Sequence, residues 1–226
     1  MASLVGSRVE RKEDKKFLTG KGRYTADINL ANQTYAYFVR SPHARAKIKN
    51  IDISKASKAS GVIRILTGKE LAADKIGGLI AGWKIVSQDG TDMKVPPHPP
   101  LATDSVNYVG DHVAIVIAES LDEAKNAAEL VKVDYKVLKA VVKTGEAMKS
   151  EAIHDGIEKN LCFDFGLGDK VKTDEALSNA DKVIKIDLEN NRLIPNAMEP
   201  RASIGDYNSS SEELTLYTAN QNPHLT

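Results

Sequence analysis

The clearest hydrophobic pattern in the chain lies between residues 108 and 137. Val113–Ala118 is a continuous apolar run, which predicts a strand buried on both faces. Ser120 and Glu123 then form a capping box, and the apolar positions that follow recur at helical spacing and are mostly small. Residues 131–137 alternate apolar and polar side chains, as in a strand with one solvated face. The pattern predicts a strand–helix–strand unit with a right-handed connection.

Shorter patterns precede this unit. They predict strands at residues 35–39, 48–53 and 62–66, a brief helix at 54–59 and a helix start at 67–70. Residues 79–86, which include the only tryptophan, Trp83, are expected to form another strand. The run Pro96–Pro100 is too poor in backbone donors for a helix or a central strand, and it predicts a surface connector.

The pattern changes after residue 137. A polar stretch without periodicity, residues 139–159, predicts a linker with a short helix near Glu146. Beyond it we expect a helix at about 171–180, a hairpin loop at Asn208–Ser211, and strands at 161–165, 182–188, 198–207 and 213–218. The sequence therefore predicts domains at 1–140 and 161–226, joined by a linker at 141–160.

Composition narrows the class of protein. The 31 lysines and arginines balance the 31 acidic residues, so no net charge attracts the chain to nucleic acid or to a membrane surface. The chain has no apolar run near the ~20 residues of a membrane helix and its N-terminus is polar, so we expect a cytoplasmic protein. The single cysteine, Cys162, excludes an iron–sulfur cluster held by this chain alone, and its apolar neighbours favour an inert thiol.

Several groups could carry chemistry, and most have a plainer structural explanation. The five histidines (43, 98, 112, 154 and 224) show no metal-ligand spacing. The glycine pairs 20/22 and 166/168 resemble phosphate loops but lack the third glycine, which favours ordinary turns. Glu199 and Arg201 share one face of an expected strand, as a structural ion pair would. Gln221 lies in an amide-rich turn at a strand end, where neutral side chains can hold a polar cofactor without adding charge.

Six stretches then occur in a fixed order: Arg11-x-Glu13-Asp14-x-x-Phe17-Leu-Thr-Gly-x-Gly22-x-Tyr24-x-x-Asp27-Ile28, Phe38-Val-Arg-Ser-Pro-His-Ala44, Tyr108-Val-Gly110-x-x-Val-Ala114, Ala127-Ala-Glu-Leu-Val-x-Val-Asp-Tyr135, Met198-Glu-Pro-Arg-Ala202 and Gln221-Asn-Pro-His224. Together they resemble the N-terminal part of the molybdopterin-binding large subunit of the molybdenum hydroxylases. That family includes carbon monoxide dehydrogenase, aldehyde oxidase and xanthine dehydrogenase. The Met-Glu-Pro-Arg form is similar to the carbon monoxide dehydrogenase-like branch.

The resemblance implies an α/β (α+β) fold, in which an α/β-hammerhead domain precedes the incomplete first segment of a molybdopterin-binding domain. It implies an oxidoreductase that uses molybdopterin and water to hydroxylate an aldehyde, an N-heterocycle or carbon monoxide. Electrons would pass to a small [2Fe-2S] subunit and a medium FAD-binding subunit. Gln221 matches the family's glutamine whose amide approaches the oxo ligand of molybdenum. His112 stands where the family often has proline.

The chain stops before the family's glycine-rich loop, substrate loop and catalytic glutamate. We therefore expect a truncated large subunit that needs the rest of that subunit, binds no cofactor alone and is inactive. An exposed sheet edge would also permit a homodimer. Two alternatives are a non-catalytic subunit-interaction module of the same fold, and a small hydrolase that uses His154 and Asp155 without a nucleophile elbow. The substrate and the roles of His112 and Trp83 stay unassigned.

Overall fold

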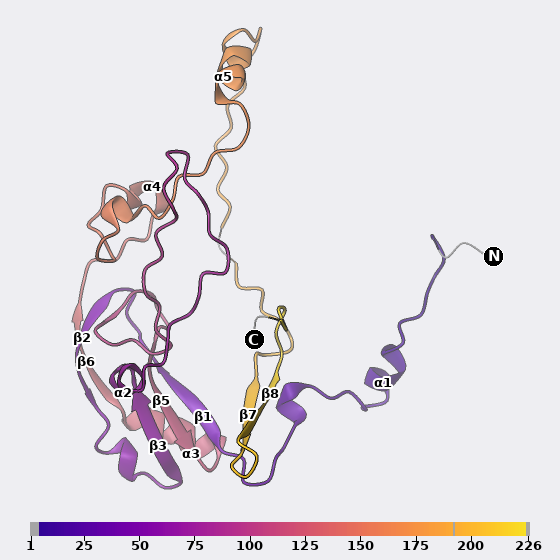
Figure 1. The fold of residues 1–226 in the computed structure, drawn as a ribbon, viewed down its shortest axis with the longest axis vertical. Helices are drawn as coiled ribbons and strands as arrows, with labels where there is room; N and C mark the ends of the chain where they lie inside the picture. Colours follow the sequence, from indigo (N-terminus) through magenta and orange to yellow (C-terminus); the bar gives the residue numbers. More distant parts are fainter. Residues whose placement is uncertain (1–4, 192, 225–226) are drawn as a thin grey trace. The chain divides into compact units, whose positions relative to one another are not determined.

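The computed structural model describes residues 5–191 and 193–224, which belong to two compact units (Figure 1). The larger unit is Thr34–Ile184. The smaller unit combines residues of Met1–Gln33 with residues of Lys185–Thr226, so it draws on both ends of the sequence.

Two three-stranded antiparallel sheets form the larger unit. In the first sheet β5 (His112–Ala118) lies between β1 (Tyr35–Arg40) and β3 (Val62–Thr67). In the second sheet β2 (Ala46–Asp52) lies between β4 (Ser105–Val106) and β6 (Lys132–Val137). The strands predicted at 35–39, 48–53, 62–66, 113–118 and 131–137 are confirmed within a few residues at their ends.

The central strand β5 is buried on both faces, as its apolar run predicts. Ala114 and Val116 are fully buried in a cluster with Ala127 of α3 (Leu121–Leu130). Val113, which points to the opposite face, is fully buried with Ala46 of β2. The hydrophobic core of this unit therefore lies on the two sides of one strand.

The Ser120 side chain caps the start of α3, and a capping box begins a second helix of the larger unit. At α3 the Ser120 hydroxyl oxygen accepts the Glu123 N–H at 3.2 Å. At α2 (Gly68–Ala73) the Glu70 carboxylate accepts the Thr67 N–H at 2.9 Å, and the Thr67 hydroxyl accepts the Lys69 N–H at 3.3 Å. Both helix starts were predicted from this spacing, because a side-chain oxygen satisfies N–H groups that have no partner within the helix.

The predicted right-handed strand–helix–strand unit is wrong in its topology. Both edges of β5 are occupied by antiparallel partners, β1 and β3. The helix α3 packs on β1 and β5 and then leads the chain to the second sheet, where β6 pairs with β2. The helix therefore joins two sheets, and β5 and β6 are not neighbours.

The remaining helices lie in both units. In the larger unit they are η2 (Ala56–Lys58), α4 (Thr144–Ala147), η3 (Glu158–Asn160) and α5 (Lys170–Ser178). In the smaller unit α1 (Asp14–Leu18) and η1 (Thr25–Asp27) precede the hairpin of β7 (Ser203–Asn208) and β8 (Glu213–Thr218). The helices predicted near 54–59, 146 and 171–180 and the hairpin loop after Asn208 are confirmed.

Three of the predicted strands do not form, and the strand predicted at 198–207 is shorter than expected. Residues 79–86, 161–165 and 182–188 lie outside the strands of the structure. In the first segment Val86 forms only an isolated antiparallel bridge with Asp92, and the Leu79 N–H donates to the His98 carbonyl at 2.8 Å. The strand predicted at 198–207 begins only at Ser203, because Pro200 has no N–H for a ladder.

Ala127→Leu is expected to lower the free energy of unfolding by about 1–3 kcal/mol, because a larger side chain overpacks the close contact between α3 and β5. Ala127 has no exposed surface. Asn126→Leu places the same side chain at the exposed neighbouring position and should change stability by less than about 0.5 kcal/mol. Urea unfolding followed by circular dichroism measures both variants. Equal effects at the two positions would contradict the packing described here.

Candidate functional site

Gln221 lies on a turn directly after β8, at the open end of the C-terminal hairpin. The hairpin is closed there by a hydrogen bond of 2.8 Å between the hydroxyls of Ser203 and Thr218. The Asn220 side-chain oxygen accepts the Asn222 N–H at 2.8 Å, which places Gln221 at the centre of an Asx turn. Gln221 is exposed. The turn therefore presents a neutral amide, which both donates and accepts hydrogen bonds.

Glu199 and Arg201 precede this hairpin and do not act as a pair. Both residues are exposed and lie outside β7. Within the described ranges 5–191 and 193–224, no salt bridge joins them. The predicted structural ion pair is therefore wrong, because the regular strand that would align the two side chains does not form.

One glycine of each pair, Gly20 and Gly168, has a left-handed backbone within a local turn or bend. Gly20 has a φ of +69° and ends α1, where the Lys21 N–H donates to the Lys16 carbonyl at 2.9 Å. Gly168 has a φ of +98° and precedes Asp169, whose carboxylate accepts the Lys172 N–H at the start of α5. A left-handed backbone of this kind favours glycine without any ligand.

Among the residues that the structure describes, no three His, Cys, Asp or Glu side chains converge to hold a metal ion. Cys162 is a free, partly buried thiol. Trp83, whose role the sequence left unassigned, is 83% exposed.

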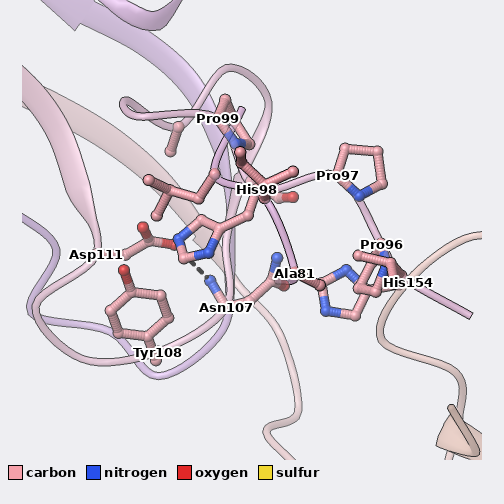
Figure 2. Close-up of a pocket in the computed structure, with 14 residues that line it drawn as sticks. Ala81, Pro96, Pro97, His98, Pro99, Asn107, Tyr108, Asp111 and His154 are labelled. Atoms are coloured by element: carbon pink, nitrogen blue, oxygen red, sulfur yellow. Dashed lines mark hydrogen bonds between the residues drawn. The ribbon is translucent and has the colours of Figure 1, made fainter. Parts of the chain in front are cut away.

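A cavity of about 440 Å³ in the larger unit was not predicted (Figure 2). Asp111 is buried at its edge, where its carboxylate accepts the Asn107 N–H at 3.1 Å. Burial raises the pKa of the Tyr108 phenol, and the negative charge of Asp111 raises it further. The His98 ring packs edge-on against Tyr108, with 6.2 Å between ring centroids. The cavity also contains His154, from the predicted linker.

The chemistry of this cavity favours binding over catalysis. Its lining combines apolar walls with two imidazoles, a phenol and a carboxylate that already caps its own loop: Leu79, Ile80, Ala81, Val95, Pro96, Pro97, His98, Pro99, Ala102, Ser105, Asn107, Tyr108, Asp111 and His154. His154 lies in this lining, but no strand-to-helix elbow that could carry a hydrolase nucleophile accompanies it in the sequence. The alternative of a hydrolase that uses His154 and Asp155 therefore gains no support.

His112 begins β5 and is held by two contacts. Its ring stacks on Phe38 with 4.4 Å between centroids, and its carbonyl accepts the Ala102 N–H at 2.7 Å. The register between β1 and β5 is irregular at Arg40, which pairs with His112. Burial lowers the pKa of His112, and the nearby Arg40 charge lowers it further.

Comparisons with known proteins place these features in a family. The model of the "aldehyde oxidase and xanthine dehydrogenase, a/b hammerhead domain" matches residues 19–139, and that of the "molybdopterin cofactor-binding domain" matches residues 153–226. The chain is 33% identical over 98% of its length to the nicotine 6-hydroxylase large subunit of Paenarthrobacter nicotinovorans. It is 32% identical over 98% of its length to the carbon monoxide dehydrogenase large chain of Afipia carboxidovorans. It spans only 26% and 28% of those two proteins.

Solved structures agree with the sequence comparisons. The quinoline 2-oxidoreductase of Pseudomonas putida 86 superimposes with a TM-score of 0.81 at 29% identity, over 96% of this chain and 27% of that chain. A Cu,Mo-CO dehydrogenase superimposes with a TM-score of 0.81 at 30% identity, over 97% of this chain and 28% of that chain. The expected combination of a hammerhead domain with part of a molybdopterin-binding domain is confirmed. In the described part of the chain, none of the helices has the length and apolar character needed to cross a membrane.

Protonation of His112 should destabilise the fold. Because its pKa is lower in the folded chain, the unfolded chain binds the proton more readily, and stability falls as pH drops below the ordinary histidine pKa of about 6.5. His112→Phe keeps an aromatic ring at this place but removes the titration. We expect it to lose less stability than the wild type between about pH 7.5 and about pH 5.5, measured by urea unfolding. His224→Gln, at an exposed position, is the control and should follow the wild type.

Proposed function

Since the chain belongs to the aldehyde oxidase and xanthine dehydrogenase family, we propose that it is the N-terminal part of the large subunit of a molybdenum-dependent oxidoreductase. The observation that carries this proposal is the order of two family models along one chain, a hammerhead model followed by a molybdopterin cofactor-binding model. We assign residues 1–140 to the hammerhead domain, 141–160 to a linker and 161–226 to the start of the cofactor-binding domain.

Gln221 is proposed as a cofactor-binding residue. The molybdenum cofactor, when bound, supplies the two-electron redox chemistry. Gln221 is exposed in the Asx turn that follows β8, where its side-chain N–H could donate a hydrogen bond to the cofactor. A neutral donor fits this task because it stabilises developing negative charge without the cost of a buried ion.

The proposed reaction is hydroxylation of an aldehyde, an N-heterocycle or carbon monoxide with water as the oxygen source. The names of the relatives support this range, since they include a nicotine 6-hydroxylase and carbon monoxide dehydrogenases. Electrons would leave through a small [2Fe-2S] subunit and a medium FAD-binding subunit. One cysteine is too few for an iron–sulfur cluster, and a relative is named as a subunit of a dehydrogenase complex.

We propose that these 226 residues alone neither hold molybdopterin nor turn over substrate. The Gln221 amide is exposed, and the cavity beside Asp111 is lined by residues of the other compact unit. The apolar side chains of the hairpin, Tyr207, Leu214 and Leu216, are exposed as well, which suits a surface that further protein covers. A cytoplasmic location and a homodimer stay predictions.

The alternative is a subunit-interaction module without catalysis. It is favoured by the self-contained core of the larger unit, whose buried clusters contain only residues of Thr34–Ile184. A domain of this kind could fold and bind other subunits without any cofactor.

The first experiment distinguishes the two functions. The protein is isolated from its natural host with an antibody against the hammerhead domain, and its mass, molybdenum, iron and flavin contents are measured. The proposal expects a polypeptide longer than 226 residues with about one molybdenum per chain and iron and flavin in associated subunits. A stable 226-residue product free of molybdenum would favour the interaction module.

Gln221→Ala in that molybdenum-containing protein should lower kcat by about 10²–10³-fold, the usual effect of removing one preorganised hydrogen-bond donor. Molybdenum content should stay close to the wild type. Ser209→Ala, in the exposed hairpin loop, is the matched control and should leave kcat unchanged. An unchanged kcat in the Gln221 variant would exclude the assigned role.

A further inference from the structure

A long loop in the larger unit ends in a small hairpin. Residues 76–100, here called the arm, connect α2 to β4 and extend away from the two sheets (Figure 1). At the tip the Ser87 N–H donates to the Thr91 carbonyl at 2.8 Å, and the Met93 N–H donates to the Ile85 carbonyl at 2.9 Å. The Asp89 carboxylate accepts the Thr91 N–H at 2.9 Å, which closes the turn. The tip therefore has a defined shape of its own.

The arm tip binds a segment that follows far along the chain. The Lys94 N–H donates to the Cys162 carbonyl at 2.9 Å, and the Gln88 N–H donates to the Asp164 carbonyl at 2.8 Å. The Asp164 N–H donates to the Ser87 hydroxyl at 3.2 Å, and the Gln88 amide donates to the Asp164 carboxylate at 3.2 Å. Four hydrogen bonds thus join the arm tip to residues 162–164.

The contact is close as well as polar. A Cβ added at Gly166 would overlap the side-chain amide of Gln88. Ser87 is buried, although the tip around it is exposed. Because Gly166 has no side chain, the Gln88 amide can lie against this segment.

The chain between β6 and this segment is also fixed. The guanidinium of Arg45, whose side chain is only 11% exposed, donates to the carbonyls of Lys139 at 3.2 Å and Ala152 at 3.0 Å. The Asn160 side chain accepts the Ile153 N–H at 2.8 Å and donates to the Ala147 carbonyl at 2.9 Å. The linker thus reaches the arm along a defined path.

We propose that the arm tip is a clip that fixes the start of the cofactor-binding domain on the hammerhead domain, with Ser87 and Gln88 as its positioning residues. The molybdopterin cofactor-binding model begins at residue 153, yet residues 153–184 belong to the same compact unit as the hammerhead sheets. The clip accounts for this overlap. The identity of the clipped segment as cofactor domain rests on the proposed function, whereas the clip itself rests on the contacts.

Cys162 reports on the clip, because it is the only cysteine, its thiol is free, and its carbonyl is bound by Lys94. It lines a groove of about 490 Å³ between the arm tip and residues 161–164, through which a thiol reagent can reach it when the clip opens. Ser87→Ala and Gln88→Ala in the 226-residue chain should raise its rate of labelling by dithiobis(nitrobenzoate) by about 2- to 10-fold, the factor expected for one lost hydrogen bond. Ser57→Ala removes a hydroxyl bonded to the Ile53 carbonyl elsewhere in the unit and should leave the rate unchanged.

A double-mutant cycle separates the clip from general stability. Gly166→Ala should raise the labelling rate in the wild type, but should add little in the Gln88→Ala background, where the overlapping amide is absent. The melting temperature should stay within about 1 °C for all of these variants, because local opening does not require global unfolding. An unchanged labelling rate in both arm variants would overturn the proposal. It would also be overturned if the effects of Gly166→Ala and Gln88→Ala on the labelling rate were additive and the melting temperature fell. Labelling needs no molybdenum, so this result is independent of the test of the proposed function.

Discussion

Burial of β5 on both faces is the constraint on which the larger unit depends. Ala114 and Val116 pack against α3, while Val113 packs against the second sheet, so the helix and both sheets are placed around one strand. Both flanking strands pair with it antiparallel, which leaves no edge for a third partner. The path of the chain follows from this. A helix that starts from a strand with no free edge has to deliver the next strand to another sheet, and that second sheet is what covers Val113.

Local signals in the sequence predicted most of the elements but not their assembly. The spacing of Ser120 and Glu123 predicted the start of α3, because a capping box acts within one turn. The period of residues 161–165 suggested a strand, yet their carbonyls accept from Gln88 and Lys94 of the arm. Hydrophobic period reports which side chains are covered, but it does not report which distant backbone supplies the hydrogen bonds. The assignment of β6 to a second sheet was missed for the same reason.

Part of the candidate site could be predicted from the sequence and part could not. The turn around Gln221 could be predicted, because adjacent amide residues after a strand favour an Asx turn, and Asn220 forms one. The cavity beside Asp111 could not, since its lining comes from the arm, from the loop before β5 and from His154. Residues that each look unremarkable in sequence become neighbours only through the fold. The assignment of Gln221 stays a prediction, because it rests on the family resemblance and not on the contacts of this chain.

The two segments that the clip joins are synthesised at different times. Ser87 precedes Asp164 by 77 residues. A ribosome that adds about 5–20 residues per second needs about 4–15 s to make that stretch. A hairpin forms in about 1–10 μs, and even the slower pairing of sheets in domains of this kind takes milliseconds to seconds. The hairpin at the arm tip therefore has time to form before residues 162–164 are synthesised, so these residues meet a formed binding partner.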